Sequence, residues 1–572
     1  MAVNFYTDNP DLRFELHNPA LQESVALREE NFTHSEKFAD APEDYADALD
    51  SYDKVLTMVG ELCGEMIAPR AEGVDQAGAS LDQGVVSYAP GTRQNLKNLT
   101  DAQLMGVMLP RQYGGLNMPV SVYTMMTEMV SRADASLQNL FGLQDIAETI
   151  NRFGSDEQKA RYLPQFCTGE ADGAMALTEP EAGSDLQNVQ LKAHLDPATN
   201  QWRLNGMKRF ITNGCAKVLL VLARSEEGSK DGRGLSMFIC ERGPGLVVRR
   251  IEDKLGIHGS PTCELQFNDV PAELVGQRRR GLTRYVMSLM NGARIAISAQ
   301  ALGVAEAACR EALKYAGERE QFGRPIIKFP PVYEMLVRDR VSIAATRALL
   351  YEATRYVDLR DMYEETNQHA ETRDPEFVKR EKKYTKIASV LTPLAKAMAT
   401  EMANQVAYDS LQVHGGTGYM RDFPVERLYR DARITNIYEG TTQLQYVAAI
   451  GGVVQRILEP LMEQISHLPF EGKLRRLASR VDTAREKLNA AVRHVEGRGD
   501  SEYFALMSGR LCEMEISVFV GYLLLRDALR DKEKTAVAEI FLQYRLPLFE
   551  MLYHTTTSDN VAVIDNHEEI LG

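Results

Sequence analysis

The spacing of apolar residues changes twice along the chain, and this change restricts the possible folds more than any other feature. From residue 52 to 153, apolar residues recur every three or four positions, as in helices that bury one face. Between about 171 and 275 they alternate with polar residues, for example from Val189 to Leu195, as in short antiparallel strands. Beyond Gly281 long helical patterns return. The sequence therefore predicts helices, then a sheet, then helices again.

The predicted fold class is α+β, and its parts can be assigned to residue ranges. A chain of 572 residues is too long for one compact core, so several packed units are expected. We assign an N-terminal helical domain to 51–170, a central antiparallel β domain to 171–280 and a C-terminal helical bundle to 281–451. Residues 1–50 are polar without a sustained period and predict an irregular arm, whereas helical spacing returns in 452–572. The last segment is therefore an extra helical domain.

Charge and composition exclude several classes of function. The 80 acidic and 65 basic residues give a net charge of −15, which would repel a phosphate backbone, so nucleic acid is not an expected partner. No apolar stretch approaches the roughly eighteen residues that a membrane span needs. The N-terminus has no visible export or organelle signal, so a cytoplasmic enzyme is expected. The seven cysteines form no CxxC pair, which predicts reduced thiols and no metal site.

Five short motifs carry the chemical signal. They are 177–185 (LTEPEAGSD), 209–214 (RFITNG), 315–326 (YAGEREQFGRPI), 412–419 (QVHGGTGY) and 437–445 (IYEGTTQLQ). Taken singly, each has an ordinary structural explanation: a hydroxyl-rich turn, a strand end, a solvated helix end, a glycine helix cap and an acid near a helix start. All five occur in order within the predicted helix, sheet and helix context. This combination is far more specific than any one motif.

Together the motifs resemble the acyl-CoA dehydrogenase family, and the resemblance covers roughly residues 50–450. It implies an FAD cofactor, an acyl-CoA substrate and electron-transfer flavoprotein as the electron acceptor. It also implies a homodimer or homotetramer, because members complete each FAD site from a second subunit. The N-terminal arm and about 120 residues beyond the usual end look like the larger branch that includes methylthiopropanoyl-CoA dehydrogenases.

The resemblance implies roles for individual positions. Thr178 and Thr212 would bond the flavin ring, and Phe210 stands where the family usually has Trp beside it. Positions of the third and fourth motifs would contact the FAD of a neighbouring subunit. The implied cofactor-binding residues are Leu177, Thr178, Ser184, Phe210, Thr212, Arg319, Gln321, Phe322, Gln412, Gly415, Gly416, Thr441 and Gln443. The implied substrate-binding residues are Ser184, Arg294, Tyr438 and Gly440.

Glu439 matches the catalytic base of the family. The α C–H of a thioester is a weak acid, so a carboxylate must remove the proton while the β hydride passes to flavin N5. A free glutamate, with a pKa of about 4.3, is too weak a base, and burial beside apolar surfaces is expected to raise that pKa. Some members carry the base at the position that is Ala293 here, and alanine cannot abstract a proton. The resemblance therefore implies α,β-dehydrogenation with Glu439 as the base.

Three alternatives share the fold. An acyl-CoA oxidase would let oxygen reach the reduced flavin, and a DNA-associated flavoprotein would need a basic surface that the net charge of −15 disfavours. An inactive relative would be expected to lack the base, yet Glu439 is present. The sequence does not specify the acyl group, because pocket depth depends on packing.

Overall fold

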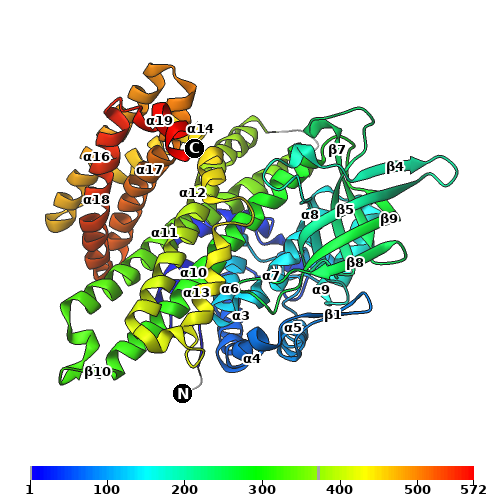
Figure 1. The fold of residues 1–572 in the computed structure, drawn as a ribbon, viewed down its shortest axis with the longest axis horizontal. Helices are drawn as coiled ribbons and strands as arrows, with labels where there is room; N and C mark the ends of the chain where they lie inside the picture. The colour runs from blue at the N-terminus through cyan, green and yellow to red at the C-terminus, as the bar shows by residue number, and fades with distance from the viewer. Residues whose placement is uncertain (1–2, 370–373) are drawn as a thin grey trace. The chain divides into compact units, whose positions relative to one another are not determined.

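The computed structural model describes residues 3–369 and 374–572 and divides into two compact units. The first unit comprises residues 1–307 with 426–435, and the second comprises 308–425 with 436–572. The boundary falls within helix α10 (Met287–Glu318). Helices come first along the chain, strands follow and helices return, which confirms the predicted α+β fold (Figure 1).

All but the last of the helices that lie in the first unit precede its sheet along the chain, apart from the start of α10. The following helices lie there: α1 (Pro10–Leu16), α2 (Gln22–Arg28), α3 (Tyr45–Glu61), α4 (Ala71–Ala77), α5 (Pro90–Asp101), α6 (Val120–Ala133), α7 (Ala135–Phe141), α8 (Asp145–Phe153), α9 (Asp156–Cys167) and most of α13 (Val425–Thr435). Ser155 begins α9 with a capping box, because its hydroxyl accepts from Gln158 N while the Gln158 side chain accepts from Ser155 N. A small hairpin of β1 (Ser80–Asp82) and β2 (Val85–Ser87) interrupts the helices. The hairpin was not predicted.

The N-terminal segment is helical, and the prediction of an irregular arm is wrong for the described part of residues 1–50. Leu12 and Leu16 lie four positions apart on α1, and Leu21 and Val25 lie four apart at the start of α2; all four side chains are buried. Each helix is only seven residues long, so it carries too few apolar positions for a sustained period. Burial against the rest of the unit stabilises such short helices, and sequence propensity alone does not.

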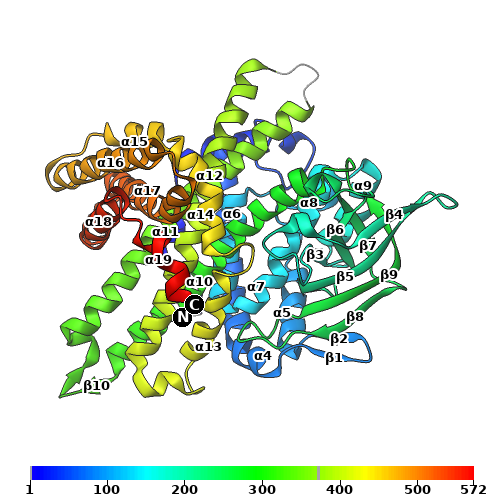
Figure 2. The same ribbon diagram turned by 45° about the horizontal axis from the view of Figure 1, so that its top comes forward.

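The sheet of the first unit consists of β3 (Gly173–Ala176), β4 (Lys192–Asp196), β5 (Gln201–Thr212), β6 (Val218–Arg224), β7 (Leu235–Glu241), β8 (Leu246–Ile251) and β9 (Thr262–Leu274). Its order is β3-β6-β4-β5-β9-β7, with β8 also paired to β9. Most pairings are antiparallel as predicted, but β3 and β4 both run parallel to β6. Because β7 also pairs with β6, the strands close on themselves, and Figure 2 shows them curving around a common interior.

Both faces of β6 are buried, which explains its uninterrupted apolar sequence. Val218, Leu220 and Leu222 face a cluster that includes Ile150 of α8 and Tyr162 of α9. The alternate residues of β6 face the interior of the sheet instead, among other buried side chains. The helices before the sheet therefore fix the position of β6, which pairs with β3, the strand directly before the first motif.

The second unit is helical. It contains β10 (Glu320–Gln321), β11 (Arg324–Pro325), α11 (Pro330–His369), α12 (Pro375–His414), α14 (Thr442–Val454), α15 (Glu459–Ser466), α16 (Gly472–Arg498), α17 (Ser501–Arg530), α18 (Thr535–Thr557) and α19 (Ala562–Leu571). Helices α16, α17 and α18 pack side by side (Figures 1 and 2), and α17 also contacts α14. The Asp500 carboxylate begins α17 by accepting from Glu502 N and Tyr503 N. The segment after residue 451 is thus an ordered helical bundle.

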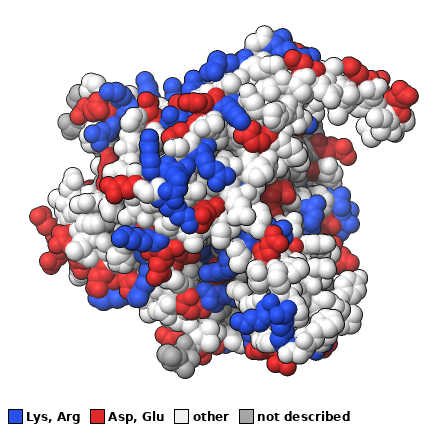
Figure 3. Space-filling model, turned by 90° about the vertical axis from the view of Figure 1, so that its left-hand side faces the viewer, with Lys and Arg blue, Asp and Glu red and all other residues white. Residues whose placement is uncertain are grey.

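The structure shows the state of the cysteines and the distribution of charge on one face. All seven cysteines are free thiols. Within residues 3–369 and 374–572, no helix is long and apolar enough to span a bilayer, and no group of three His, Cys, Asp or Glu side chains could hold a metal ion. On the face shown in Figure 3, basic side chains stand in small groups among acidic ones.

Candidate active site

The loop that carries the first motif is anchored by a buried lysine. Lys208 of β5 is fully buried, and its Nζ donates to Leu177 O at 2.7 Å and to a Glu179 carboxylate oxygen at 2.9 Å. The same carboxylate accepts from the main-chain N–H groups of Gln190 and Leu191 at 2.7 and 3.0 Å. Burial lowers the pKa of Lys208 to about 8, and the Glu179 charge opposes that shift. These bonds hold residues 177–185 against the strand that carries the second motif.

The backbone bulges at Phe210 and presents its ring outward. Lys208 pairs with Leu265 and Ile211 with Cys263, so two residues of β5 oppose only Glu264 of β9. Phe210 has a φ of 60°, an unusual value for a bulky residue, and its side chain is 52% exposed. The Arg209 guanidinium lies 4.6 Å from the centre of the ring. An exposed aromatic on a strained bulge is typical of a ligand-contacting position.

The remaining candidates of the first unit differ in their burial. Arg209 N donates to Thr178 O at 2.9 Å, which brings the first two motifs side by side. Thr178 and Thr212 are half-buried, and Ser184 is exposed. Leu177 is buried. Arg294 is buried on α10, where it donates to the Asn291 side chain at 3.1 Å.

The third and fourth motifs also meet, within the second unit. The Tyr315 ring stacks on the His414 ring with centres 4.3 Å apart. Beyond Tyr315, β10 and β11 form a hairpin whose two-residue loop is Phe322 and Gly323, both with positive φ. The Phe322 side chain is 93% exposed. The exposed candidates of these motifs are Arg319, Gln321, Phe322, Gln412, Gly415 and Gly416.

Glu439 lies in a tight turn between α13 and α14. Its φ is 54° and that of Gly440 is 92°, so two successive residues have the left-handed backbone. An alanine at position 440 would place its Cβ 2.7 Å from Gln445 Nε2, which explains the glycine. Glu439 and its neighbours Tyr438, Gly440 and Thr441 are half-buried, whereas Gln443 is exposed. The turn is therefore strained, partly accessible and located at the N-terminus of α14.

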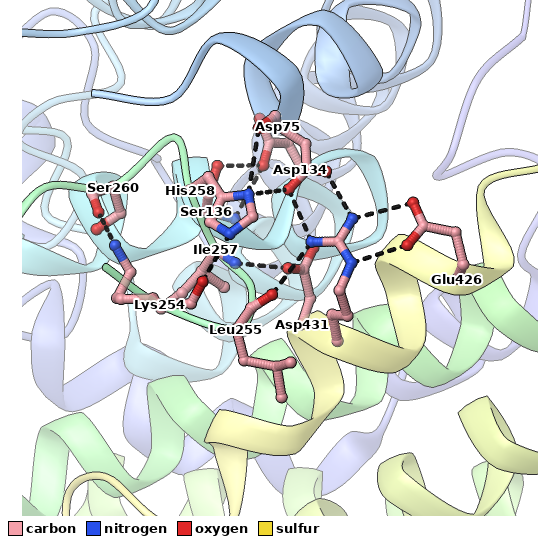
Figure 4. A network of polar contacts seen from close by, with 11 residues as sticks. Asp75, Asp134, Ser136, Lys254, Leu255, Ile257, His258, Ser260, Glu426 and Asp431 are labelled. Carbon is pink, nitrogen blue, oxygen red and sulfur yellow. Dashed lines mark hydrogen bonds and ion pairs between the residues drawn. The ribbon is translucent and has the colours of Figure 1, made fainter. Parts of the chain in front are cut away.

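A polar network in the first unit holds the helix that precedes this turn along the chain (Figure 4). Arg430 of α13 pairs with Asp75 of α4 at 2.6 Å and with Glu426 at 2.8 Å. Asp431 is buried and accepts from Ile257 N at 2.6 Å. His258 Nδ1 lies 2.8 Å from the Asp75 carboxylate. The network joins α4, the 254–260 loop and α13.

Gly256 allows the close approach of this loop to α13. A Cβ at residue 256 would lie 2.6 Å from the Asp431 carboxylate and 2.8 Å from the Arg430 backbone. Burial raises the pKa of Asp431 to about 6. Burial alone would also raise the pKa of Asp75, but the hydrogen bonds and charge of Arg430 lower it overall. The segment from Lys254 to Ile257 thus has a structural role.

Comparison with known proteins decides the family. Residues 50–170, 174–270 and 280–450 match the N-terminal, middle and C-terminal domains of acyl-CoA dehydrogenase. Residues 457–550 match a further domain described as acyl-CoA dehydrogenase C terminal. The chain belongs to the acyl-CoA dehydrogenase family. It is therefore a flavoprotein oxidoreductase of acyl-CoA thioesters, as the motifs indicate.

Individual relatives refine this placement. The acryloyl-CoA reductase (NADH) of Anaerotignum propionicum is 36% identical over 368 residues, which cover 64% of this chain and 87% of the relative. The 3-methylmercaptopropionyl-CoA dehydrogenase of Ruegeria pomeroyi is 34% identical over 486 residues, covering 78% of this chain and 79% of the relative. A solved acyl-CoA dehydrogenase from Bacillus anthracis, complexed with FAD, has a TM-score of 0.75 at 25% identity and covers 89% of this chain and 88% of its own. The predicted resemblance to the larger branch is confirmed.

The residues of this acyl-CoA dehydrogenase fit an FAD. His414 Nε2 is buried and has no hydrogen-bond partner among the described residues. Directly after it, a Cβ added at Gly415 or Gly416 would meet nothing within 4 Å, so the backbone there is open to a ligand. Burial lowers the pKa of His414, which favours a neutral imidazole. A donor-rich glycine turn of this kind suits a diphosphate.

Sequence reasoning missed two buried lysines, Lys208 and Lys396. Lys208 stands in an alternating stretch, where a lysine is ordinarily exposed. Lys396 lies in the middle of α12, fully buried, and its Nζ donates to Gly440 O at 2.6 Å. The only available signal was its place among consecutive apolar and small residues of the helix.

Proposed function

We propose that this dehydrogenase oxidises an acyl-CoA thioester to the 2-enoyl-CoA, with Glu439 removing the α proton. The observation that carries the proposal is the turn at Glu439 and Gly440, where two left-handed residues hold a carboxylate immediately before a helix. A non-glycine residue in this conformation costs about 1–3 kcal/mol and persists where the surroundings impose it. Such strain is typical of functional positions.

Glu439 acts on the substrate by a single proton transfer. The thioester carbonyl acidifies the α C–H, and the carboxylate accepts that proton as the β C–H bond breaks. Bound FAD supplies the acceptor for the two electrons and the hydrogen from the β carbon. The main-chain amide of Glu439 would donate to the thioester oxygen and stabilise the developing negative charge.

The other candidate residues bind and orient in this proposal. Thr178 and Thr212 bond the flavin ring, and the exposed Phe210 ring packs beside it. Ser184 contacts the diphosphate and the thioester, and Arg294 contacts the coenzyme A part. The hairpin with Phe322 reaches the FAD of a second subunit in this proposal, as the family resemblance implies, and its 93% exposure leaves the ring accessible to such a partner. A homodimer or homotetramer follows.

Electron-transfer flavoprotein is the proposed acceptor of the electrons. Its use distinguishes a dehydrogenase from an oxidase, which passes electrons to oxygen. Because the chain is also similar to an acryloyl-CoA reductase (NADH), the experiment must also test whether the enzyme oxidises a saturated acyl-CoA or reduces an enoyl-CoA. The acyl group is the remaining variable, and the similarity to a 3-methylmercaptopropionyl-CoA dehydrogenase supports a short thioether acyl chain as the first substrate to test.

The experiment mixes the FAD-loaded enzyme with a panel of acyl-CoA thioesters, straight-chain, branched, aromatic and thioether, and follows the flavin absorbance. We expect bleaching without oxygen that persists in air and is reversed by electron-transfer flavoprotein. Rapid recovery in air with formation of peroxide would instead identify an oxidase. Reduction of the flavin by NADH, with no bleaching by any saturated acyl-CoA, would overturn the proposed direction.

A further inference from the structure

Two side chains of the second unit, Lys396 and Gln445, donate hydrogen bonds to main-chain carbonyl groups of the turn that carries Glu439. Lys396 Nζ donates to Gly440 O at 2.6 Å. Gln445, on the first turns of α14, donates through Nε2 to Glu439 O at 3.1 Å and to Gly440 O at 2.8 Å. Both side chains are fully buried. The main-chain carbonyls of Glu439 and Gly440 therefore each accept a hydrogen bond from a buried side chain.

The two ends of the same turn are tied to α12 as well. Glu401 accepts from the Thr442 hydroxyl after the turn and from Asn436 Nδ2 before it, the latter at 3.1 Å. Residues 436–442 are thus held at both ends and in the middle by α12. A non-glycine residue keeps the strained left-handed backbone conformation only where several surrounding contacts impose it, as they do at Glu439.

Burying the Lys396 ammonium to bind a carbonyl carries an unfavourable desolvation free energy. Removing a charged group from water costs several kcal/mol unless it is well hydrogen-bonded, and an apolar side chain would fill the same space at no such cost. Lys396 lies among buried apolar and small residues of α12, including Leu394 and Ala397. The hydrogen bond from its ammonium fixes the position of the Gly440 carbonyl, which an apolar side chain of the same length could not do.

We propose that Lys396, together with Gln445, is a positioning residue that fixes the peptide planes on either side of Gly440 and thereby aims the Glu439 carboxylate. The inference rests on the proposed function, because it assigns the aimed carboxylate as the base. Rotation of either peptide would change the backbone torsions at residues 439 and 440 and swing the side chain of Glu439. Lys396 touches neither substrate nor cofactor in this role.

The central variant is Lys396→Met, which keeps the length of the side chain and removes the donor. Lys487→Met is the matched control, because Lys487 also belongs to the second unit and pairs with Glu550 at 2.6 Å, away from the turn. We expect Lys396→Met to retain FAD and to keep the KM for acyl-CoA within about twofold, while flavin reduction slows about tenfold or more, as misplaced catalytic groups do. Lys487→Met should reduce its flavin at the parent rate.

Two readouts separate positioning from a merely structural role. Anaerobic exchange of the substrate α proton with deuterated water reports proton removal itself, and it should slow in Lys396→Met as flavin reduction does. Amide hydrogen exchange of the 437–445 peptide should accelerate in Lys396→Met and not in Lys487→Met. This second readout needs no turnover, so it remains informative even if no acyl-CoA reduces the parent enzyme and the proposed function fails.

Gln445→Met serves if Lys396→Met does not fold, because it removes the other donor to the same carbonyls, and the same pattern is expected. A parent-like rate of flavin reduction together with parent-like exchange of the 437–445 peptide in either folded variant would overturn the proposal. Faster exchange with an unchanged rate of proton removal would also overturn it, since Lys396 would then stabilise the turn without aiming the base.

Discussion

Arg430 and Asp75 are 355 positions apart in the sequence and form a two-pronged ion pair, with N···O distances of 3.1 and 2.6 Å. The pair joins α13 to α4 within the first unit, and both side chains are mostly buried. Helix α13 ends at Thr435, and the turn with Glu439 follows directly in the chain. The pair therefore fixes the helix from which the base-bearing turn starts.

Asp75→Asn should weaken this junction. The amide keeps the shape but loses the charge-assisted hydrogen bonds, which are worth about 1–3 kcal/mol. We expect a lower Tm in differential scanning fluorimetry. The difference from the parent should shrink as the pH falls toward about 4 and below, because a carboxyl with a lowered pKa contributes stability above its unfolded pKa and loses it on protonation. Asp101→Asn, in an exposed pair with Lys97, should have little effect.

Asp431 should give the opposite pH dependence. Its pKa of about 6 lies above the value of about 3.9 for an unfolded aspartate, so the folded state binds the proton more tightly. The contribution of Asp431 to stability is therefore greatest below about pH 4 and is lost as the pH rises through 6. The Tm of the parent relative to Asp431→Asn should fall over that interval. A constant difference across the interval would contradict the assignment.

Glu515→Gln should stabilise the extra helical bundle. Glu515 is buried on α17, its Oε1 has no hydrogen-bond partner among the described residues, and burial followed by the charge of Glu459 raises its pKa to about 8. An unfolded glutamate ionises near pH 4.3, so the parent loses stability between about pH 4.3 and 8. The Tm advantage of the variant should grow with pH over this window. Glu486→Gln, an exposed control on α16, should change nothing.

Phe322→Ala tests the proposed subunit contact. The ring is 93% exposed within one chain, so its removal should leave the stability of the isolated chain unchanged. If the hairpin completes the FAD site of a neighbour, the variant should lose bound flavin and shift toward smaller assemblies in light scattering. Val85→Ala, at another exposed apolar position, is the control. Full flavin content and unchanged mass in Phe322→Ala would refute the contact.

The sequence predicts the order of helices and strands because apolar spacing reports which face of each element is buried. It fails where burial is created by partners distant in the chain. Leu12 and Leu16 belong to a helix too short to show a period, and only the rest of the unit buries them. The parallel pairing of β3 with β6 joins strands about 40 residues apart in the chain, and alternation does not encode which strands pair or in which direction.

The motifs predict which residues belong to the candidate site, but not what holds them. The positive φ of Phe210 comes from a bulge opposite β9, and that of Glu439 is imposed by contacts from α12 and α14. Non-glycine residues rarely adopt this backbone conformation, so the residue types at these positions did not predict it. Lys208 and Lys396 have no signature as buried donors, because a lysine in sequence is ordinarily a solvated one.

The most direct test of the account is anaerobic flavin reduction by an acyl-CoA in Glu439→Gln. The amide preserves the shape of the side chain and removes the base, so the variant should bind FAD and acyl-CoA as the parent does. We expect its flavin to stay oxidised in the presence of a substrate that bleaches the parent. Full bleaching at the parent rate would show that another group removes the α proton and would contradict the assignment of Glu439.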